Sequence, residues 1–382
     1  MIKVIEAISD TNIGGAGILL ENRLSHTNKK IFDTTVIIPK NSMLRDRLRK
    51  IGAKVLEIDS GKDKSLDLKS ILEYLCILKK VKPDIINSHG SLSSRIAAYI
   101  FGVPVRIYTR HCVFPTHPIY KFNLPKRFFS LITNSLSHGI IAVSPSAKDN
   151  LLAMGVKEQR IAVIINGSKK LEKLDVSKRK RIREELGISN DKIVITICAR
   201  LEKCKDHVCF IKAAYLLNKR SNKYVFMIIG SGREEEKLKK LSQKMNLCDK
   251  IIFTGFVNDV TKYMNITDIN VNCSIGTETS SLALSEGMSL GIPSVVSDYG
   301  GNPYMVKNNI NGYVYKRSDY RDLASKIEKV ALKENYKRLS KNSKLRFLNE
   351  LNSKQMNKKV QTFYINLHKK LKVKPKGKHT PI

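Results

Sequence analysis

Two glutamates separated by seven residues could hold the hydroxyl groups of a sugar nucleotide. Glu278 lies in a polar loop, and Glu286 lies in the apolar run 282–290, where Leu284 and Met288 are one helical turn apart. The start of such a helix presents free backbone N–H groups and the positive end of its dipole, which suit a diphosphate between the two carboxylates. Each carboxylate could then accept hydrogen bonds from one sugar ring. The same pair also fits a solvated loop glutamate and a helix-surface glutamate.

Two cations follow a second apolar segment, 192–199. Arg200 and Lys205 come directly after this expected strand and before an expected helix. Cations in that position can neutralise a diphosphate. In so basic a chain, either residue alone also fits ordinary surface charge.

Strand and helix signals alternate along the whole chain and must position these residues. In the first half the pattern predicts strands at 3–8, 34–38, 54–58, 84–89, 104–109 and 139–143, and helices at 18–26, 43–51, 66–80, 93–101 and 128–136. In the second half it predicts strands at 192–199, 224–229, 251–256, 269–273, 294–297 and 312–315, and helices at 282–290, 323–332 and 338–370. The expected fold class is α/β, with two doubly wound parallel sheets whose ligands lie beyond the strand C-termini.

The order of these motifs resembles the donor site of one enzyme family. Glu278 and Glu286 are followed by Gly-Ile-Pro, a strand, an aspartate and Gly-Gly, and Ala-Arg-Leu-x-x-x-Lys-Asp-His occupies 199–207. Both segments resemble signatures of the retaining GT-B glycosyltransferases of the "group 1" type (family 4). Two departures are Thr279, where the family usually has Gly, and Gly287, where it usually has Ala. Thr279 leaves the sugar specificity open.

The resemblance implies a GT-B architecture, with two Rossmann-like domains facing a cleft, and a role for each site residue. Glu278 would contact the donor sugar and Glu286 the ribose, while Arg200 and Lys205 would bind the diphosphate and stabilise the leaving group. The remaining donor-binding positions implied by the family are Gly14 and Gly15 in a Gly-rich turn, Gly230 beside the base, and Ser280, Ser281 and Leu282 at the helix start. The family also implies front-face attack, with the leaving diphosphate as the base.

Two histidines, His89 and His111, occupy the ends of neighbouring expected strands. A single histidine in such a place is more often a hydrogen-bonded structural residue. For His111, the strand-Thr-x-His pattern resembles the family segment in which a histidine meets the donor sugar. His89 has a looser counterpart in the family.

The expected domain organisation has five parts. An N-terminal, acceptor-side Rossmann-like domain spans 1–168, a charged linker 169–190, and a nucleotide-sugar-binding Rossmann-like domain 191–345. A helix at 346–368 is expected to cross back to the first domain, and a basic, disordered tail to follow at 369–382.

Composition limits the partners. Of the 382 residues, 69 are basic and 34 acidic, a net charge of +35, so anionic partners are expected. No nucleic-acid-binding signature and no metal-ligand spacing is present, and the chain lacks the Asp-x-Asp pair that usually holds a nucleotide-bound cation. The seven cysteines show no CxxC spacing, and the N-terminus reads as a first strand rather than a signal peptide. A cytoplasmic protein is expected, peripheral on the inner face of the cell membrane.

The resulting hypothesis is a retaining, metal-independent hexosyltransferase that uses a nucleotide-diphosphate sugar, a UDP-sugar above others. The acceptor would be a lipid-linked or cell-envelope glycan, and no other cofactor is required. Basic segments at 43–51 and 118–129 would contact anionic membrane, although the first also fits an ordinary amphipathic helix that covers the sheet. The alternatives are a GT-B sugar-nucleotide epimerase and, from another class, a basic nucleic-acid-binding protein.

Overall fold

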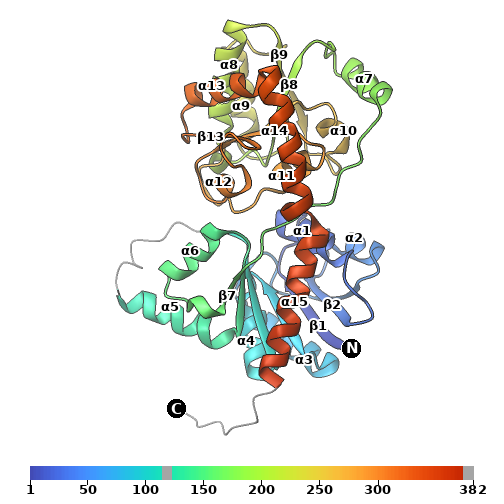
Figure 1. The fold of residues 1–382 in the computed structure, drawn as a ribbon. Coiled ribbons are helices and arrows are strands. Elements are labelled where there is room, and N and C mark those ends of the chain that lie inside the picture. Colours follow the sequence, from blue (N-terminus) through green and yellow to red (C-terminus); the bar gives the residue numbers. More distant parts are fainter. Residues whose placement is uncertain (114–122, 373–382) are drawn as a thin grey trace. The chain divides into compact units, whose positions relative to one another are not determined.

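The computed structural model describes residues 1–113 and 123–372, without the side chains of 123–126. The chain forms two compact units, one ending at Gly167 and resumed from Ser353 onward, and one from Ser168 to Asn352. Each unit is a parallel β-sheet with helices packed against it (Figure 1). The predicted pair of Rossmann-like domains, the GT-B architecture, is therefore confirmed.

The first unit contains a seven-stranded sheet in the order β3-β2-β1-β4-β5-β6-β7. Its strands are β1 Ile2–Ile8, β2 Phe32–Pro39, β3 Lys54–Ile58, β4 Ile85–His89, β5 Val105–Arg110, β6 Gly139–Ala142 and β7 Ile161–Val163. Its α-helices are α1 Gly15–Leu24, α2 Arg45–Lys50, α3 Leu68–Val81, α4 Leu92–Phe101, α5 Asn123–Leu136, α6 Pro145–Ala153 and α15 Ser353–Lys372. The strand order reverses between β1 and β4, and ligands of doubly wound sheets bind at such a switch point.

The second unit contains a six-stranded sheet in the order β10-β9-β8-β11-β12-β13, which reverses between β8 and β11. Its strands are β8 Ile193–Cys198, β9 Tyr224–Ile229, β10 Ile251–Gly255, β11 Ile269–Asn272, β12 Ser294–Ser297 and β13 Gly312–Tyr315. Its α-helices are α7 Val176–Glu185, α8 His207–Arg220, α9 Glu235–Lys244, α10 Thr261–Met264, α11 Leu282–Ser289, α12 Asn302–Met305, α13 Tyr320–Ala331 and α14 Lys333–Arg346. A π-helical turn, Phe347–Leu351, follows α14.

Apolar runs in the strands account for the layered cores. In β1, Ile5 packs into a cluster with residues of α3 and α4, whereas Ile8 packs into another cluster with residues of α1 and α2. The central strand of the second unit likewise has Val194 in one cluster and Ile195 in another. Because helices cover both faces of these parallel strands, the strands read as continuous apolar segments rather than alternating ones.

Some element boundaries differ from those expected. The charged segment 169–190 contains α7, because the Asp175 side chain caps the helix by accepting the Lys178 N–H and Ile182 is buried against β8 and β9 residues. The chain rejoins the first unit at Ser353 rather than 346, and α15 continues to Lys372. The expected tail beyond 372, and residues 118–122 of the second basic segment, lie outside the described residues.

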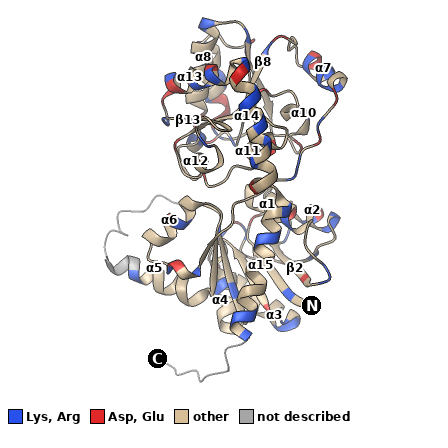
Figure 2. Ribbon diagram, in the orientation of Figure 1, with Lys and Arg blue, Asp and Glu red and all other residues tan. Residues whose placement is uncertain are grey.

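Lysine and arginine residues occur on elements of both units (Figure 2). Within residues 1–113 and 123–372, no helix is both long and apolar enough to cross a bilayer.

Candidate active site

A buried carboxylate with three donors lies at the switch point of the second sheet. The Glu278 Oε2 atom accepts from Lys205 Nζ at 2.7 Å and from the Ser274 hydroxyl at 2.8 Å. It also accepts from Asn272 Nδ2 at 3.1 Å. Asn272 ends β11, and Lys205 lies in a short 3₁₀ turn that follows β8. The two strands at the point of reversal therefore bring together Glu278 and Lys205, which are 73 positions apart.

The pair is charged although it is buried. Burial of Glu278 would raise its pKa, but the Lys205 ammonium and the donors from Asn272 and Ser274 hold the pKa of this carboxyl below its usual value. All three donors converge on Oε2. Within the described residues no side-chain hydrogen bond reaches Oε1, so this oxygen is the one that can accept a hydroxyl of a bound sugar.

Two glycines fix the loop that carries Glu278. Gly300 has φ +58°, and a Cβ on it would lie 2.2 Å from the carbonyl oxygen of Glu278. A Cβ on Gly301 would lie 1.4 Å from the Thr279 carbonyl oxygen. The Gly301 N–H donates to the Glu278 carbonyl at 3.3 Å. Only glycine permits this approach, so the Gly-Gly motif positions the loop that carries Glu278.

Arg200 is exposed where the chain leaves β8, and none of the described residues forms an ion pair with it. Its loop packs against the turn after β9, where a Cβ on Gly230 (φ +133°) would lie 2.1 Å from the Ala199 carbonyl oxygen. The Leu201 N–H donates to the Ser231 carbonyl at 2.9 Å. Gly230 therefore has a structural reason to be glycine, and contact of this turn with a nucleotide base stays a prediction.

Helix α11 begins beside the Glu278 loop. Ser281 is its N-cap residue, with a hydroxyl that accepts the Leu284 N–H at 3.3 Å, and the Ser281 N–H donates to Met305 Sδ. Ser280 is buried and Leu282 is half-buried. Of the N–H groups in the first turn of α11, those of Leu282 and Ala283 have no intrahelical acceptor, as the predicted phosphate site requires.

Glu286 lies one helical turn after Leu282 and is half-buried. Burial and the charge of Asp259 raise its pKa to about 7. The next residue, Gly287, faces β11, where a Cβ would lie 2.7 Å from Asn270 Nδ2. This contact explains why glycine replaces the family's usual alanine.

The Gly-rich turn of the first unit is open. Gly14 is the N-cap residue of α1, and a Cβ on Gly15 would meet no atom within 4 Å. Gly17, in contrast, packs against Leu44. Packing within the unit would therefore allow a larger residue at positions 14 and 15. The predicted approach of a phosphate to the backbone remains a reason why both positions are glycine.

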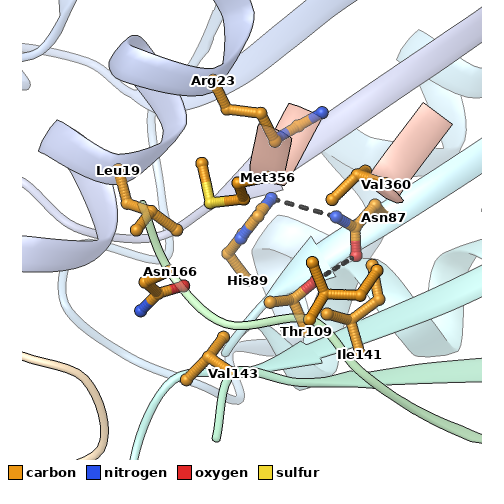
Figure 3. A pocket seen from close by; sticks show the side chains of 11 residues that line it. Leu19, Arg23, Asn87, His89, Thr109, Ile141, Val143, Asn166, Met356 and Val360 are labelled. Carbon is orange, nitrogen blue, oxygen red and sulfur yellow. Dashed lines mark hydrogen bonds between the residues drawn. The ribbon is translucent and has the colours of Figure 1, made fainter. Parts of the chain in front are cut away.

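His89 and His111 are joined to each other and to a buried glutamate. The His89 Nδ1 and His111 Nε2 atoms lie 2.8 Å apart, and the two rings stack with centroids 5.1 Å apart. His89 Nε2 lies 2.8 Å from Glu6 Oε2. His89 and Asn87 also line a cavity of about 20 Å³ in this unit, enough for about one water molecule (Figure 3).

Sequence reasoning missed Asn272, Ser274 and Glu6. The signal for Glu6 was available, because a lone glutamate in the apolar run VIEAI should lie in a buried strand and need a partner. Asn272 and Ser274 carry no such signal.

In the described residues there is no cluster of three or more His, Cys, Asp or Glu that could hold a metal ion.

Comparison with known proteins agrees with this geometry. The family model "Glycosyl transferases group 1" matches residues 178–346, and "Glycosyltransferase Family 4" matches residues 13–168. The chain is 29% identical over 311 residues to the Escherichia coli UDP-Gal:alpha-D-GlcNAc-diphosphoundecaprenol alpha-1,3-galactosyltransferase, covering 79% of this chain and 80% of that protein. It is 24% identical over 360 residues to the capsular polysaccharide biosynthesis glycosyltransferase CapM of Staphylococcus aureus, covering 91% of this chain and 93% of that protein.

A solved structure shares the fold of both units. The crystal structure of Anabaena HepE in complex with UDP and glucose superposes with a TM-score of 0.82 at 17% identity, covering 96% of this chain and all of that one. The fold and the matched motifs define a GT-B glycosyltransferase. The chain belongs to the group 1, family 4 type of these enzymes.

Proposed function

We propose that this protein is a retaining hexosyltransferase that moves a sugar from a UDP-sugar to a lipid-linked or cell-envelope glycan. The observation that carries the proposal is the Lys205–Glu278 pair at the β8/β11 switch point, with the start of α11 beside it. The likeness to the undecaprenol-linked and capsular glycosyltransferases supports this class of acceptor. The UDP-bound HepE structure supports UDP as the nucleotide.

The residues divide the work as follows. Arg200 supplies an uncompensated positive charge to the diphosphate, because the charge of Lys205 is already balanced by Glu278. The N–H groups at the start of α11 stabilise the charge that develops on the leaving diphosphate. Glu278 Oε1 accepts a hydroxyl of the donor sugar, and Glu286 accepts the ribose hydroxyls. With no second carboxylate assigned as nucleophile, the departing diphosphate takes the proton of the acceptor hydroxyl.

The first test is a thermal-shift screen against UDP-, GDP- and ADP-sugars, followed by transfer assays with lipid-linked acceptors. Stabilisation by UDP-sugars and acceptor-dependent UDP release are expected. Sugar-nucleotide isomerisation without any acceptor would instead identify an epimerase.

Glu286→Gln is expected to weaken UDP binding about 10-fold or more and to raise the melting temperature of the ligand-free protein above neutral pH. The folded-state pKa of Glu286 is raised to about 7, so its ionisation costs stability as the pH rises through that value, and glutamine removes the cost. Because ribose hydroxyls bind the ionised form better, wild-type UDP affinity should increase across the same range. Calorimetry and thermal unfolding on both sides of neutrality test this.

Asp259→Asn is the matched control, since it should shift the midpoint of UDP affinity to lower pH by removing the charge that acts on Glu286. A wild-type affinity that does not change with pH would contradict the assignment of Glu286 to the ribose.

Turnover is expected to survive EDTA. The sequence contains no Asp-x-Asp pair, and Arg200 with the N–H groups at the start of α11 can stabilise the diphosphate charge without a divalent cation. Rates before and after chelation, with Mn²⁺ and Mg²⁺ added back, check this; a strict requirement for either ion would overturn it.

We also propose that the first unit binds anionic membrane, but not through α2. Leu44 and Leu48 are buried against the sheet, as in an ordinary amphipathic helix, and Arg47 forms an ion pair with Glu21 at 2.6 Å. Helices α4 and α5 instead leave large apolar side chains exposed. These are Tyr99, Ile100, Phe101, Phe128 and Leu131.

The membrane proposal predicts sedimentation with anionic liposomes that decreases with salt, because screening weakens the attraction. Combined replacement of Phe128 and Leu131 by serine and of Arg127 by glutamate should abolish sedimentation. Replacement of Arg45 and Arg47 by glutamate, the matched control, should have a smaller effect, because both arginines already contact carboxylates of the chain. If wild type ignores anionic liposomes at low salt, a soluble acceptor becomes the better hypothesis.

A further inference from the structure

A buried asparagine joins the ends of two strands beside the loop that carries Glu278. Asn302 is fully buried at the start of α12, and the preceding residue, Gly301, donates its N–H to the Glu278 carbonyl. The Nδ2 atom of Asn302 donates to Asn272 Oδ1 at 3.3 Å and to the Ser297 hydroxyl at 3.0 Å. Asn272 ends β11 and Ser297 ends β12, which are paired in the sheet. One side chain therefore connects both strand ends.

The contact between Asn302 and Ser297 has a fixed direction. The Ser297 hydroxyl donates its single proton to the Ser274 carbonyl oxygen at 2.6 Å, because that oxygen can only accept. The Ser297 oxygen must then accept, so the atom of Asn302 that faces it is the nitrogen. Ser274 is also the residue whose own hydroxyl donates to Glu278 Oε2 at 2.8 Å. Through Ser297, Asn302 thus holds one donor of Glu278 in place.

The contact between Asn302 and Asn272 fixes a second donor. Asn272 Oδ1 accepts from Asn302 and, at 3.0 Å, from the Ser274 backbone N–H. A half-turn of the Asn272 amide would place its N–H₂ group against these two donors and its oxygen against the Glu278 carboxylate. Asn272 therefore keeps Nδ2 toward Glu278 Oε2, which lies 3.1 Å away.

Asn302 leaves one of its own atoms unpaired in this arrangement. Its Oδ1 atom is buried, and none of the described residues donates a hydrogen bond to it. A half-turn of the amide would not satisfy this oxygen, because it would then face the acceptor atoms of Ser297 and Asn272. An unpaired buried carbonyl lowers stability. The amide is therefore poorly used for stability, whereas its nitrogen serves two residues that hold the donors of Glu278.

We propose that Asn302 is a positioning residue that holds Asn272 and Ser274 against Glu278 Oε2, so that Oε1 is the oxygen presented to the donor sugar. Lys205, the third donor, has a flexible stem and does not by itself distinguish the two carboxylate oxygens. The two neutral donors, fixed through Asn302, keep the carboxylate in one orientation. The proposal rests on the proposed function only in assigning the donor sugar to Glu278.

Asn302→Leu tests the proposal, because leucine has nearly the shape of asparagine but no N–H group to donate. The Ser297 hydroxyl and Asn272 Oδ1 each lose a donor, so the donors of Glu278 become free to reorient. Ser297→Ala is a milder second variant. It releases Ser274 but leaves the bond between Asn302 and Asn272, and should show part of the effect.

Asn265→Leu is the matched control. Asn265 is a buried asparagine of the same unit, and its side chain bonds backbone groups of residues 172, 174 and 261. Its replacement removes a comparable set of hydrogen bonds without touching the donors of Glu278. The control therefore measures what the loss of a buried amide does to the fold alone.

The first readout is the position of the donors in crystal structures of the ligand-free proteins. In wild type and in Asn265→Leu, Asn272 and Ser274 should both donate to the same oxygen of Glu278. In Asn302→Leu at least one of them should have left that oxygen, and in Ser297→Ala it should be Ser274. Both donors in their wild-type places in a folded Asn302→Leu or Ser297→Ala would overturn the proposal, whatever the activity.

The second readout is kinetic. Asn302→Leu should lower kcat about 10- to 100-fold, because a small displacement of a positioned group costs that much, while UDP affinity stays within about twofold. Ser297→Ala should show a smaller loss of kcat, and Asn265→Leu should stay near wild type. Equal losses of kcat in Asn302→Leu and Asn265→Leu would indicate a merely structural role for Asn302.

A double variant separates this positioning role from the proposed function. In a Glu278→Gln background, Asn302→Leu should cause little further loss of kcat, because its effect passes through Glu278. Additive losses would refute the positioning role. Wild-type kinetics of Glu278→Gln would instead refute the contact between Glu278 and the donor sugar, and the donor positions in the ligand-free structures would still decide what Asn302 holds.

Discussion

Glu278→Gln is expected to slow turnover about 10- to 150-fold, which corresponds to about 1.5–3 kcal/mol, and to change nucleotide affinity little. In the wild type, Lys205, Ser274 and Asn272 all donate to Oε2 of Glu278. The glutamine oxygen must take this position to satisfy them. The amide N–H₂ then replaces Oε1, so the donor sugar meets a donor where it had an acceptor.

The measurements are kcat and KM for the UDP-sugar, with UDP affinity from calorimetry. Glu286→Gln is the matched comparison, since that glutamate is assigned to the ribose and its loss should appear in affinity. Wild-type kinetics for Glu278→Gln would remove the donor-sugar assignment.

Lys205→Ala is expected to destabilise the protein by about 3–5 kcal/mol, whereas Arg200→Ala should stay within about 0.5 kcal/mol of wild type. The side chains of Lys205 and Glu278 are only 16% and 8% exposed, so removal of the ammonium leaves a buried, unpaired carboxylate. Neither cation lies in an apolar run of the sequence, which predicts that each substitution lowers turnover more than stability. The burial of the Lys205–Glu278 pair adds the expectation of a large loss of stability for Lys205→Ala.

The double variant Lys205→Ala, Glu278→Gln should recover much of the lost stability, because the unpaired charge is gone.

The stability that the Lys205–Glu278 pair contributes to the wild type also depends on pH. The folded-state pKa of Glu278 is lowered, so its contribution is present at neutral pH and is lost as the pH falls through that lowered value. Unfolding curves at neutral and decreasing pH check both points, and a single variant Lys205→Ala as stable as wild type would contradict the buried-pair interpretation.

The sequence by itself determined the two-sheet architecture and the family. Apolar runs such as 193–198 and 224–229 can only be strands covered on both sides, and their alternation with helices leaves few topologies. The spacing of Glu278 and Glu286, and the Arg200–Lys205 segment, are local patterns that a linear reading can detect. Gly287 was noted as an exception to the family, and its contact with Asn270 now explains it.

Only the tertiary structure decided which residues act on one another. Lys205 and Glu278 meet because β8 and β11 are neighbours in the sheet, and Glu6 reaches His89 because β1 pairs with β4. The surroundings of α2 also depend on the tertiary structure. The sequence of α2 fits both a helix that contacts a membrane and a helix that packs on the sheet. Its apolar residues pack against α1 and the strands, which favours the second interpretation. Burial, ion pairing and pKa depend on neighbours that are distant in sequence, and local periodicity carries no information about them.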